Sequence, residues 1–242
     1  MKKSYLTILT VIAGISLLAL SSCRMRCERG SGHWITENRK VTDFKKLDIS
    51  GAFDVVLKQD SSLTVSVAAD DNLLKIIKTE IDGDKLRIST DGKNICSSSG
   101  DLTVTIGVHN LNDIKALGAI NITSTGKIVA KDIHLDLAGA TKVNIDLDAA
   151  NVNTEANGAT EIALKGQATS HTIDLNGGGK VHAFDFVVGN YSITTQGASE
   201  CEINVLHDLT VNSSGASVIK YKGNPTSIKN EKSGASSITK VN

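Results

Sequence analysis

Apolar and polar residues alternate along the second half of this 242-residue chain, in segments that recur about every 19 residues. Alternation at a period of two places successive side chains on opposite faces of an extended chain, so each segment predicts a half-buried β-strand. A glycine followed by alanine or a second glycine separates neighbouring segments, and successive glycines of this series stand 18 to 21 residues apart. The series consists of Gly118, Gly139, Gly158, Gly177, Gly197, Gly215 and Gly234.

Positions at a fixed distance from these glycines are apolar in one repeat after another. Four residues after the glycines from Gly139 onward come Val143, Ile162, Val181, Cys201, Ile219 and Ile238. A fixed period of this length is typical of repeat architectures, in which strands pair with their counterparts one repeat away and inward side chains form continuous ladders. The pattern predicts an all-β solenoid with coils of about 19 residues. Glycine suits its tight corners because it tolerates positive φ and leaves room for the neighbouring coil.

The two ends of the predicted solenoid differ from its middle. Asn230 and Lys232 stand where the repeat calls for apolar residues, which predicts a polar cap on the last coil. Residues 41–117 alternate over shorter stretches with longer turns, and we expect an irregular opening section continuous with the solenoid. Its Ser50-Gly51-Ala52 resembles a first corner, and residues 71–78 are the best candidate for a short helix.

Residues 1–22 have the composition of an export signal. Lys2 and Lys3 precede an apolar run from Leu6 to Leu20. The run ends in Leu20-Ser21-Ser22-Cys23, which resembles the lipobox of bacterial lipoproteins and implies cleavage before Cys23 and lipidation of that residue. The alternative is an ordinary signal peptide or signal anchor, although the run is short for a transmembrane span.

Residues 23–40 are interpreted as a lipid-anchored basic tether, followed by the solenoid domain at 41–242. Residues 24–46 hold seven basic residues against three acidic ones, a composition that either contacts an anionic bilayer surface or forms a solvated linker. The whole chain has 26 basic and 26 acidic residues, which argues against a nucleic-acid partner.

Three cysteines remain after Cys23. Cys201 occupies an inward phase, where valine or isoleucine stands in other repeats, and is expected in the core. That leaves Cys27 and Cys96 as candidate partners of a disulfide, a question that the separation of their Cα atoms decides. There is no Cys-x-x-Cys motif, so we expect no structural zinc.

The residues that could perform chemistry form no recognisable constellation. Outward strand positions hold several carboxylates that are interpreted as a solvated face, although two such groups at a suitable separation can act as acid and base on polysaccharides. They are Asp136, Asp146, Asp148, Asp174 and Glu202. The six histidines lack metal-ligand spacing, and His171 falls on an inward phase. We therefore predict no enzyme activity, no metal and no cofactor. Aromatic residues are few, which disfavours a deep glycan site.

The opening section also resembles a known bacterial family. The stretches that carry the resemblance are Gly30-Ser31-Gly32, residues 37–41, Phe44, residues 49–55, residues 69–74 and residues 82–88, and the later Ser-Gly-Ala-Ser corners are similar too. Over roughly residues 27–242 the chain resembles the putative auto-transporter adhesin, head GIN domain family. The resemblance implies a right-handed parallel β-helix-like solenoid and an exported protein, often a lipoprotein. It carries no catalytic residues.

Three functions follow as hypotheses. The first is a non-catalytic, lipid-anchored solenoid of the bacterial outer membrane that acts as an adhesin or binds a glycan, matrix or envelope-protein ligand. The second is a periplasm-facing structural or lipid-handling lipoprotein, and the third is a polysaccharide-active enzyme. The sequence does not determine whether the domain faces the cell surface or the periplasm.

Overall fold

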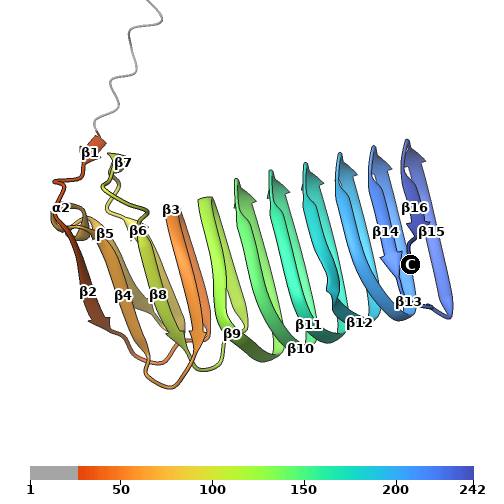
Figure 1. The fold of residues 1–242 in the computed structure, drawn as a ribbon, viewed down its shortest axis with the longest axis horizontal. Helices are drawn as coiled ribbons and strands as arrows, with labels where there is room; N and C mark the ends of the chain where they lie inside the picture. The colour runs from red at the N-terminus through yellow and green to blue at the C-terminus, as the bar shows by residue number, and fades with distance from the viewer. Residues whose placement is uncertain (1–26) are drawn as a thin grey trace, which may run out of the picture.

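A computed structural model describes residues 27–242, so the predicted export signal and Cys23 lie outside the described residues. The described chain is a stack of β-coils, with an irregular section at its N-terminal end (Figure 1). Among these residues there is no helix with the length and apolar character needed to cross a membrane. The long strands of the central coils are β9 (Asp113–Gly139), β10 (Lys142–Gly158), β11 (Glu161–Gly177), β12 (Lys180–Gly197) and β13 (Glu200–Gly215).

Neighbouring coils pair in parallel with an offset of about 19 residues, as the sequence predicts. Val152 pairs with Ile133 on one side and with His171 on the other. The inward phase four residues after each glycine forms one ladder across successive coils, which confirms the predicted solenoid and the buried position of Cys201. This ladder runs Val143, Ile162, Val181, Cys201, Ile219 and Ile238.

The seven glycines of the repeat all have positive φ and stack on one another. Gly158 pairs in register with Gly139 and Gly177, and a Cβ on Gly158 would lie 2.8 Å from the carbonyl oxygen of Gly139. The N–H after each glycine donates to the glycine carbonyl of the preceding coil, as from Ala159 to Gly139 at 3.0 Å. We call this edge of the solenoid the glycine corner.

The C-terminal end of the stack consists of three short strands, β14 (Val218–Lys222), β15 (Ser227–Gly234) and β16 (Ser237–Lys240), of which β16 begins a further coil on β14. Asn230 pairs with the buried Val211 but is itself exposed, and Lys232 is exposed as well. Both side chains therefore lie where the expected polar cap requires them.

The opening section begins a coil and then departs from it. Strand β3 (Lys46–Gln59) pairs in parallel with β9, and Gly51 lies in register with Gly118, as the sequence suggests for a first corner. An N-terminal insertion follows, which caps this end of the stack. It comprises β4 (Thr64–Asp70), α2 (Asp71–Leu74), β5 (Ile77–Asp82), β6 (Lys85–Thr90), β7 (Asn94–Ser97) and β8 (Thr103–Val108). Strands β4 and β5 pair antiparallel with their neighbours, whereas β6 and β8 also pair in parallel with β3. The helix is shorter than the predicted 71–78, because Ile77 already pairs with Thr90 in a strand.

The interpretation of residues 23–40 as a tether is wrong for the part that the structure describes. Residues Cys27–Arg29 form β1, and Trp34–Lys40 form β2, which pairs antiparallel with β4 at the end of the sheet. The Arg39 guanidinium donates to the backbone carbonyls of Ile77 at 2.7 Å and Leu74 at 2.9 Å. This basic segment therefore belongs to the fold because its backbone and its arginine find partners there.

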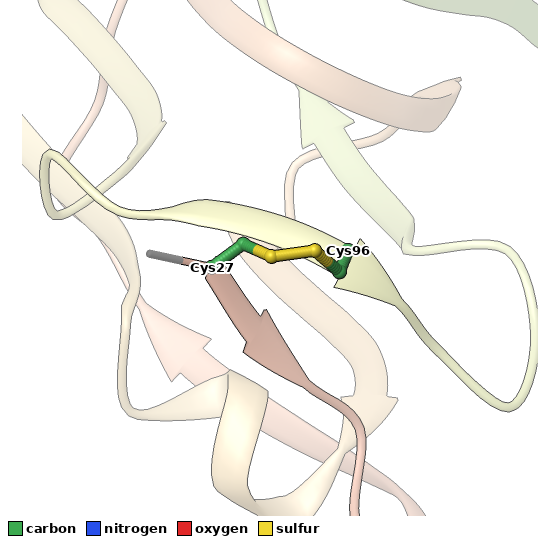
Figure 2. Close-up of a disulfide and its surroundings, with 2 residues drawn as sticks. All are labelled: Cys27 and Cys96. Atoms are coloured by element: carbon green, nitrogen blue, oxygen red, sulfur yellow. A yellow bond between two sulfur atoms is a disulfide. The ribbon is translucent and has the colours of Figure 1, made fainter. Parts of the chain in front are cut away.

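A disulfide joins Cys27 in β1 to Cys96 in β7, with a Cα–Cα separation of 5.5 Å (Figure 2). The two short strands pair in parallel and form a sheet of their own. Next to them the buried Asp70 accepts hydrogen bonds from the backbone N–H groups of Gly32 at 2.9 Å and Ser99 at 2.8 Å. The disulfide and Asp70 together hold the first described residues against the loop that follows β7.

Candidate binding surface

The strand segments that lead into the glycine corner carry short polar side chains on their outer side. We define the polar face as the outward side chains of residues 132–138, 151–157, 170–176, 190–196 and 208–214. Its members are Asp132, His134, Asp136, Ala138, Asn151, Asn153, Glu155, Asn157, Ser170, Thr172, Asp174, Asn176, Asn190, Ser192, Thr194, Gln196, Asp208, Thr210, Asn212 and Ser214. Nearly all of them are hydroxyl, amide or carboxyl groups, and none is lysine or arginine.

Because the coils are in register, the polar face forms rows in which each side chain lies one strand spacing from the next. Hydrogen bonds link several neighbours along these rows. Asn151 donates to Asp132 at 2.7 Å, and the hydroxyl of Ser170 donates to Asn151 at 2.7 Å. Asn176 donates to Asn157 at 3.2 Å. The outer groups are thereby held in a regular array before any ligand arrives.

One row of the polar face carries an acidic charge. Glu155 lies in register between Asp136 and Asp174. The Lys115 ammonium lies 2.6 Å from Asp136, and this carboxylate raises the pKa of Lys115. Within residues 27–242, Glu155 and Asp174 have no ion-pair partner. The centre of the face therefore keeps an excess of negative charge.

The strand segments that leave the glycine corner form the charged face, which we define as the outward side chains of residues 142–147, 161–166, 180–185, 200–205, 218–222 and 237–240. Several acidic and basic groups form ion pairs there. Lys142 pairs with Glu161 at 3.1 Å and lowers the pKa of that carboxyl. Lys220 pairs with Glu200 at 2.7 Å and with Glu202 at 3.4 Å. A hydrogen bond from His182 at 2.9 Å is the largest cause of the lowered pKa of Glu202. Since these charges are already paired, this face offers less to a ligand than the polar face does.

The five outward carboxylates of the sequence do not converge. Asp136 and Asp174 lie on the polar face, Asp146 and Glu202 lie on the charged face, and Asp148 stands where the chain turns between the two. Among residues 27–242, no group of three or more histidine, cysteine, aspartate or glutamate side chains could hold a metal ion. The arrangement therefore supports recognition along a surface rather than acid–base chemistry at one point.

The buried polar residues of the core lie away from both faces. His171 is inward, as its phase predicts, and its Nε2 lies 2.9 Å from the hydroxyl of Thr154. Burial lowers the pKa of His171 to about 3, so the ring is neutral at ordinary pH. Tyr191 packs against it with ring centroids 5.3 Å apart. This cluster is part of the core and has no open path to a ligand, since both rings are buried.

Sequence reasoning missed the corner opposite the glycines. Val129 and Leu206 are 56% and 45% exposed there, although both are large apolar residues. The only signal in the sequence is an apolar residue at the end of an alternating segment, and that signal does not distinguish an exposed corner from a buried one.

A known protein family matches most of this chain. The family model described as "Putative auto-transporter adhesin, head GIN domain" matches residues 43–225. The chain belongs to this family. No curated protein sequence matches the chain. The resemblance noted from the opening section is thus confirmed, and the match also covers the glycine corners from Gly51 to Gly215.

Several solved structures share the architecture. A putative adhesin from Bacteroides fragilis has a TM-score of 0.82 at 21% identity, covering 88% of this chain and 100% of its own. A putative adhesin from Parabacteroides distasonis has a TM-score of 0.69 at 21% identity, covering 89% and 100%. A protein described as a putative lipid binding protein from Parabacteroides distasonis has a TM-score of 0.70 at 18% identity, covering 90% and 100%. At these identities the likeness shows the fold alone.

Proposed function

We propose that this protein is an exported, lipid-anchored and non-catalytic solenoid of the outer membrane, which binds a glycan-bearing or matrix surface through the polar face. The observation that carries the proposal is the in-register array of hydroxyl, amide and carboxyl groups, linked by hydrogen bonds such as Asn151 to Asp132. Such an array matches a repetitive polar ligand, because each coil presents short polar groups at the same register positions, one strand spacing from those of the next coil. The head GIN family description supports an adhesin-like role.

The first experiment locates the domain. Protease is added to intact cells, and the fragment that carries residues 28–242 is followed. Rapid removal of this fragment is the result that we expect for a surface adhesin. Protection that ends only when the envelope is permeabilised would contradict the adhesin role and would favour the periplasm-facing alternative. That alternative draws support from the lipid-binding description of one structural neighbour.

The second experiment tests the polar face itself. Thr172 and Asn212 are exposed on this face, and lysine at both positions would obstruct two rows. We expect Thr172→Lys with Asn212→Lys to weaken binding of the full chain to immobilised glycans or matrix by roughly ten-fold. The matched control is Asn144→Lys with Thr239→Lys, which adds the same charge on the opposite side. Equal loss in both variants, or no binding by the unmodified chain, would contradict the proposal.

A further inference from the structure

The corner opposite the glycines is hollow where the coils turn from the charged face to the polar face. We call it the alanine corner and define it by residues 128–131, 148–150, 167–169, 187–189 and 206–207. A depression of about 490 Å³ runs across it. Its lining includes Val129, Ala130, Asp148, Ala149, Ala168 and Leu206.

The depression exists because successive coils place small side chains at the same register. Ala149 pairs with Ala130 on one side and Ala168 on the other. Larger apolar side chains stand around them, and Val129 and Leu206 are exposed by about half. The lining thus combines exposed apolar side chains with the polar Asp148, Gln167 and Thr169, a mixture that suits an amphiphilic ligand.

A second depression of about 620 Å³ adjoins the first, since Val129 and Ala130 line both. It adds two exposed lysines, Lys45 and Lys131, to the apolar surface. Within residues 27–242, the ammonium group of neither lysine has an ion-pair partner.

The acidic groups of the two depressions reduce but do not cancel this positive charge. Asp148 pairs with Lys127 at 3.7 Å, whereas Asp132 accepts a hydrogen bond from the neutral Asn151 at 2.7 Å and keeps its charge. Lys45 and Lys131 against Asp132 therefore leave the second depression with one net positive charge.

We propose that the alanine corner binds a free single-chain amphiphile with a carboxylate head, a fatty acid in chemical class. The head would lie between Lys45 and Lys131, and the chain would extend across Ala149 and Ala168 toward Leu206. From Val129 to Leu206 the groove crosses four strand spacings, about 19 Å at about 4.8 Å each. This length suits one acyl chain, because half of a bilayer's hydrocarbon core is about 15 Å thick.

This site adjoins the polar face at Asp132 but includes neither Thr172 nor Asn212. Its loss would leave binding through Thr172 and Asn212 intact, so failure of one proposal is distinguishable from failure of the other. The site would also give the lipid-handling alternative a defined location.

The test is photo-crosslinking of the purified full chain with palmitic acid that carries a diazirine near its methyl end. After irradiation, peptides with covalent adducts are mapped by mass spectrometry. We expect adducts on the peptide that contains Leu206, because the methyl end of the chain would lie there. Val129→Asn with Leu206→Asn should lower this labelling by about ten-fold, a factor that corresponds to about 1.4 kcal/mol. Both residues are exposed, so the substitutions leave the core unchanged, and a thermal melt checks that the fold persists.

Controls separate the apolar and ionic parts of the site. Leu117→Asn is the matched variant, because Leu117 is 53% exposed but lies beside the glycine corner, and labelling should not change. Lys45→Gln with Lys131→Gln should reduce labelling by the acid to the level of the corresponding fatty alcohol. Labelling spread equally over Leu117, or insensitive to the lysines, would overturn the proposal. So would labelling that appears only when the probe is presented in phosphatidylcholine vesicles.

Discussion

Single residues determine how closely the coils approach, and Gly158 shows this most directly. Its φ is +107°, and an added Cβ would lie 2.8 Å from the Gly139 carbonyl oxygen. We expect Gly158→Ala to destabilise the protein by about 3 kcal/mol, because it combines backbone strain with a clash against backbone atoms. Denaturant unfolding of the variant and the unmodified chain measures the difference.

Gly178 provides the control for that prediction. It follows Gly177 where other repeats have alanine, its φ is not positive, and nothing lies within 4 Å of an added Cβ. Gly178→Ala should therefore be neutral or stabilise by up to about 1 kcal/mol through the unfolded chain. If both variants lose the same stability, the close approach of the glycines is not what determines the cost.

The buried His171 makes stability depend on pH. Its pKa falls from 6.5 to about 3 on folding, so below pH 6.5 the unfolded chain binds a proton that the folded chain does not. The folded state is therefore penalised as the pH falls from 6.5 toward 3, by about 2 kcal/mol at pH 5.

The variant His171→Val isolates this penalty, since valine already stands at the paired position 152. Unfolding free energies at pH 7 and pH 5 should differ by about 2 kcal/mol less in the variant than in the unmodified chain. An unchanged difference would mean that other groups cause the acid sensitivity.

At the scale of elements, alternation allowed the repeating strands to be predicted but not the N-terminal ones. Strands β9 to β13 each bury one phase, so the period of two is visible in the sequence. Strand β2 buries no large apolar side chain and is held instead by backbone pairing with β4 and by Arg39. Its sequence therefore lacks the alternation of apolar and polar residues that predicts a strand, and it reads as a tether. The polar face can be predicted from the outward positions of the alternating segments. The hollow at the alanine corner cannot, because the exposure of Val129 depends on how the coils turn in the folded structure.

The pairing of β1 with β7 depends on the disulfide, because the two strands are short and bury little apolar surface. These strands have three and four residues and pair only with each other, too few to be stable alone. The Cys27–Cys96 bond closes a separation of 69 residues, for which chain entropy predicts a contribution of about 4 kcal/mol.

Reduction should therefore lower the unfolding midpoint of the protein in denaturant. The same reductant should have no effect on Cys27→Ser with Cys96→Ser, because the described residues of this variant hold no disulfide and Cys201 is a free, buried thiol. A midpoint that is unchanged by reduction would show that β1 and the loop after β7 contribute little to global stability.

At the scale of the whole molecule, a stack of coils must end its core ladders without inviting another chain to continue them. The N-terminal end is covered by the N-terminal insertion and β2 (Figure 1). The last described strands, β15 and β16, carry Asn230, Lys232 and Lys240 at inward positions, beside the apolar Ile228 and Ile238. Natural sheets use charged residues in this way to prevent edge-to-edge association.

Polar residues at this end are therefore expected to limit association through the edge. Asn230→Val with Lys232→Val would place apolar side chains at inward positions of the last described coil, where they pair with Val211 and Ser213. We expect this variant to self-associate in size-exclusion chromatography with light scattering. Lys229→Val with Glu231→Val adds the same apolar side chains at outward positions and should associate less. Equal association would show that added hydrophobicity alone drives it, whereas a monomeric Asn230/Lys232 variant would show that the edge is protected by strand geometry instead of by its polar side chains.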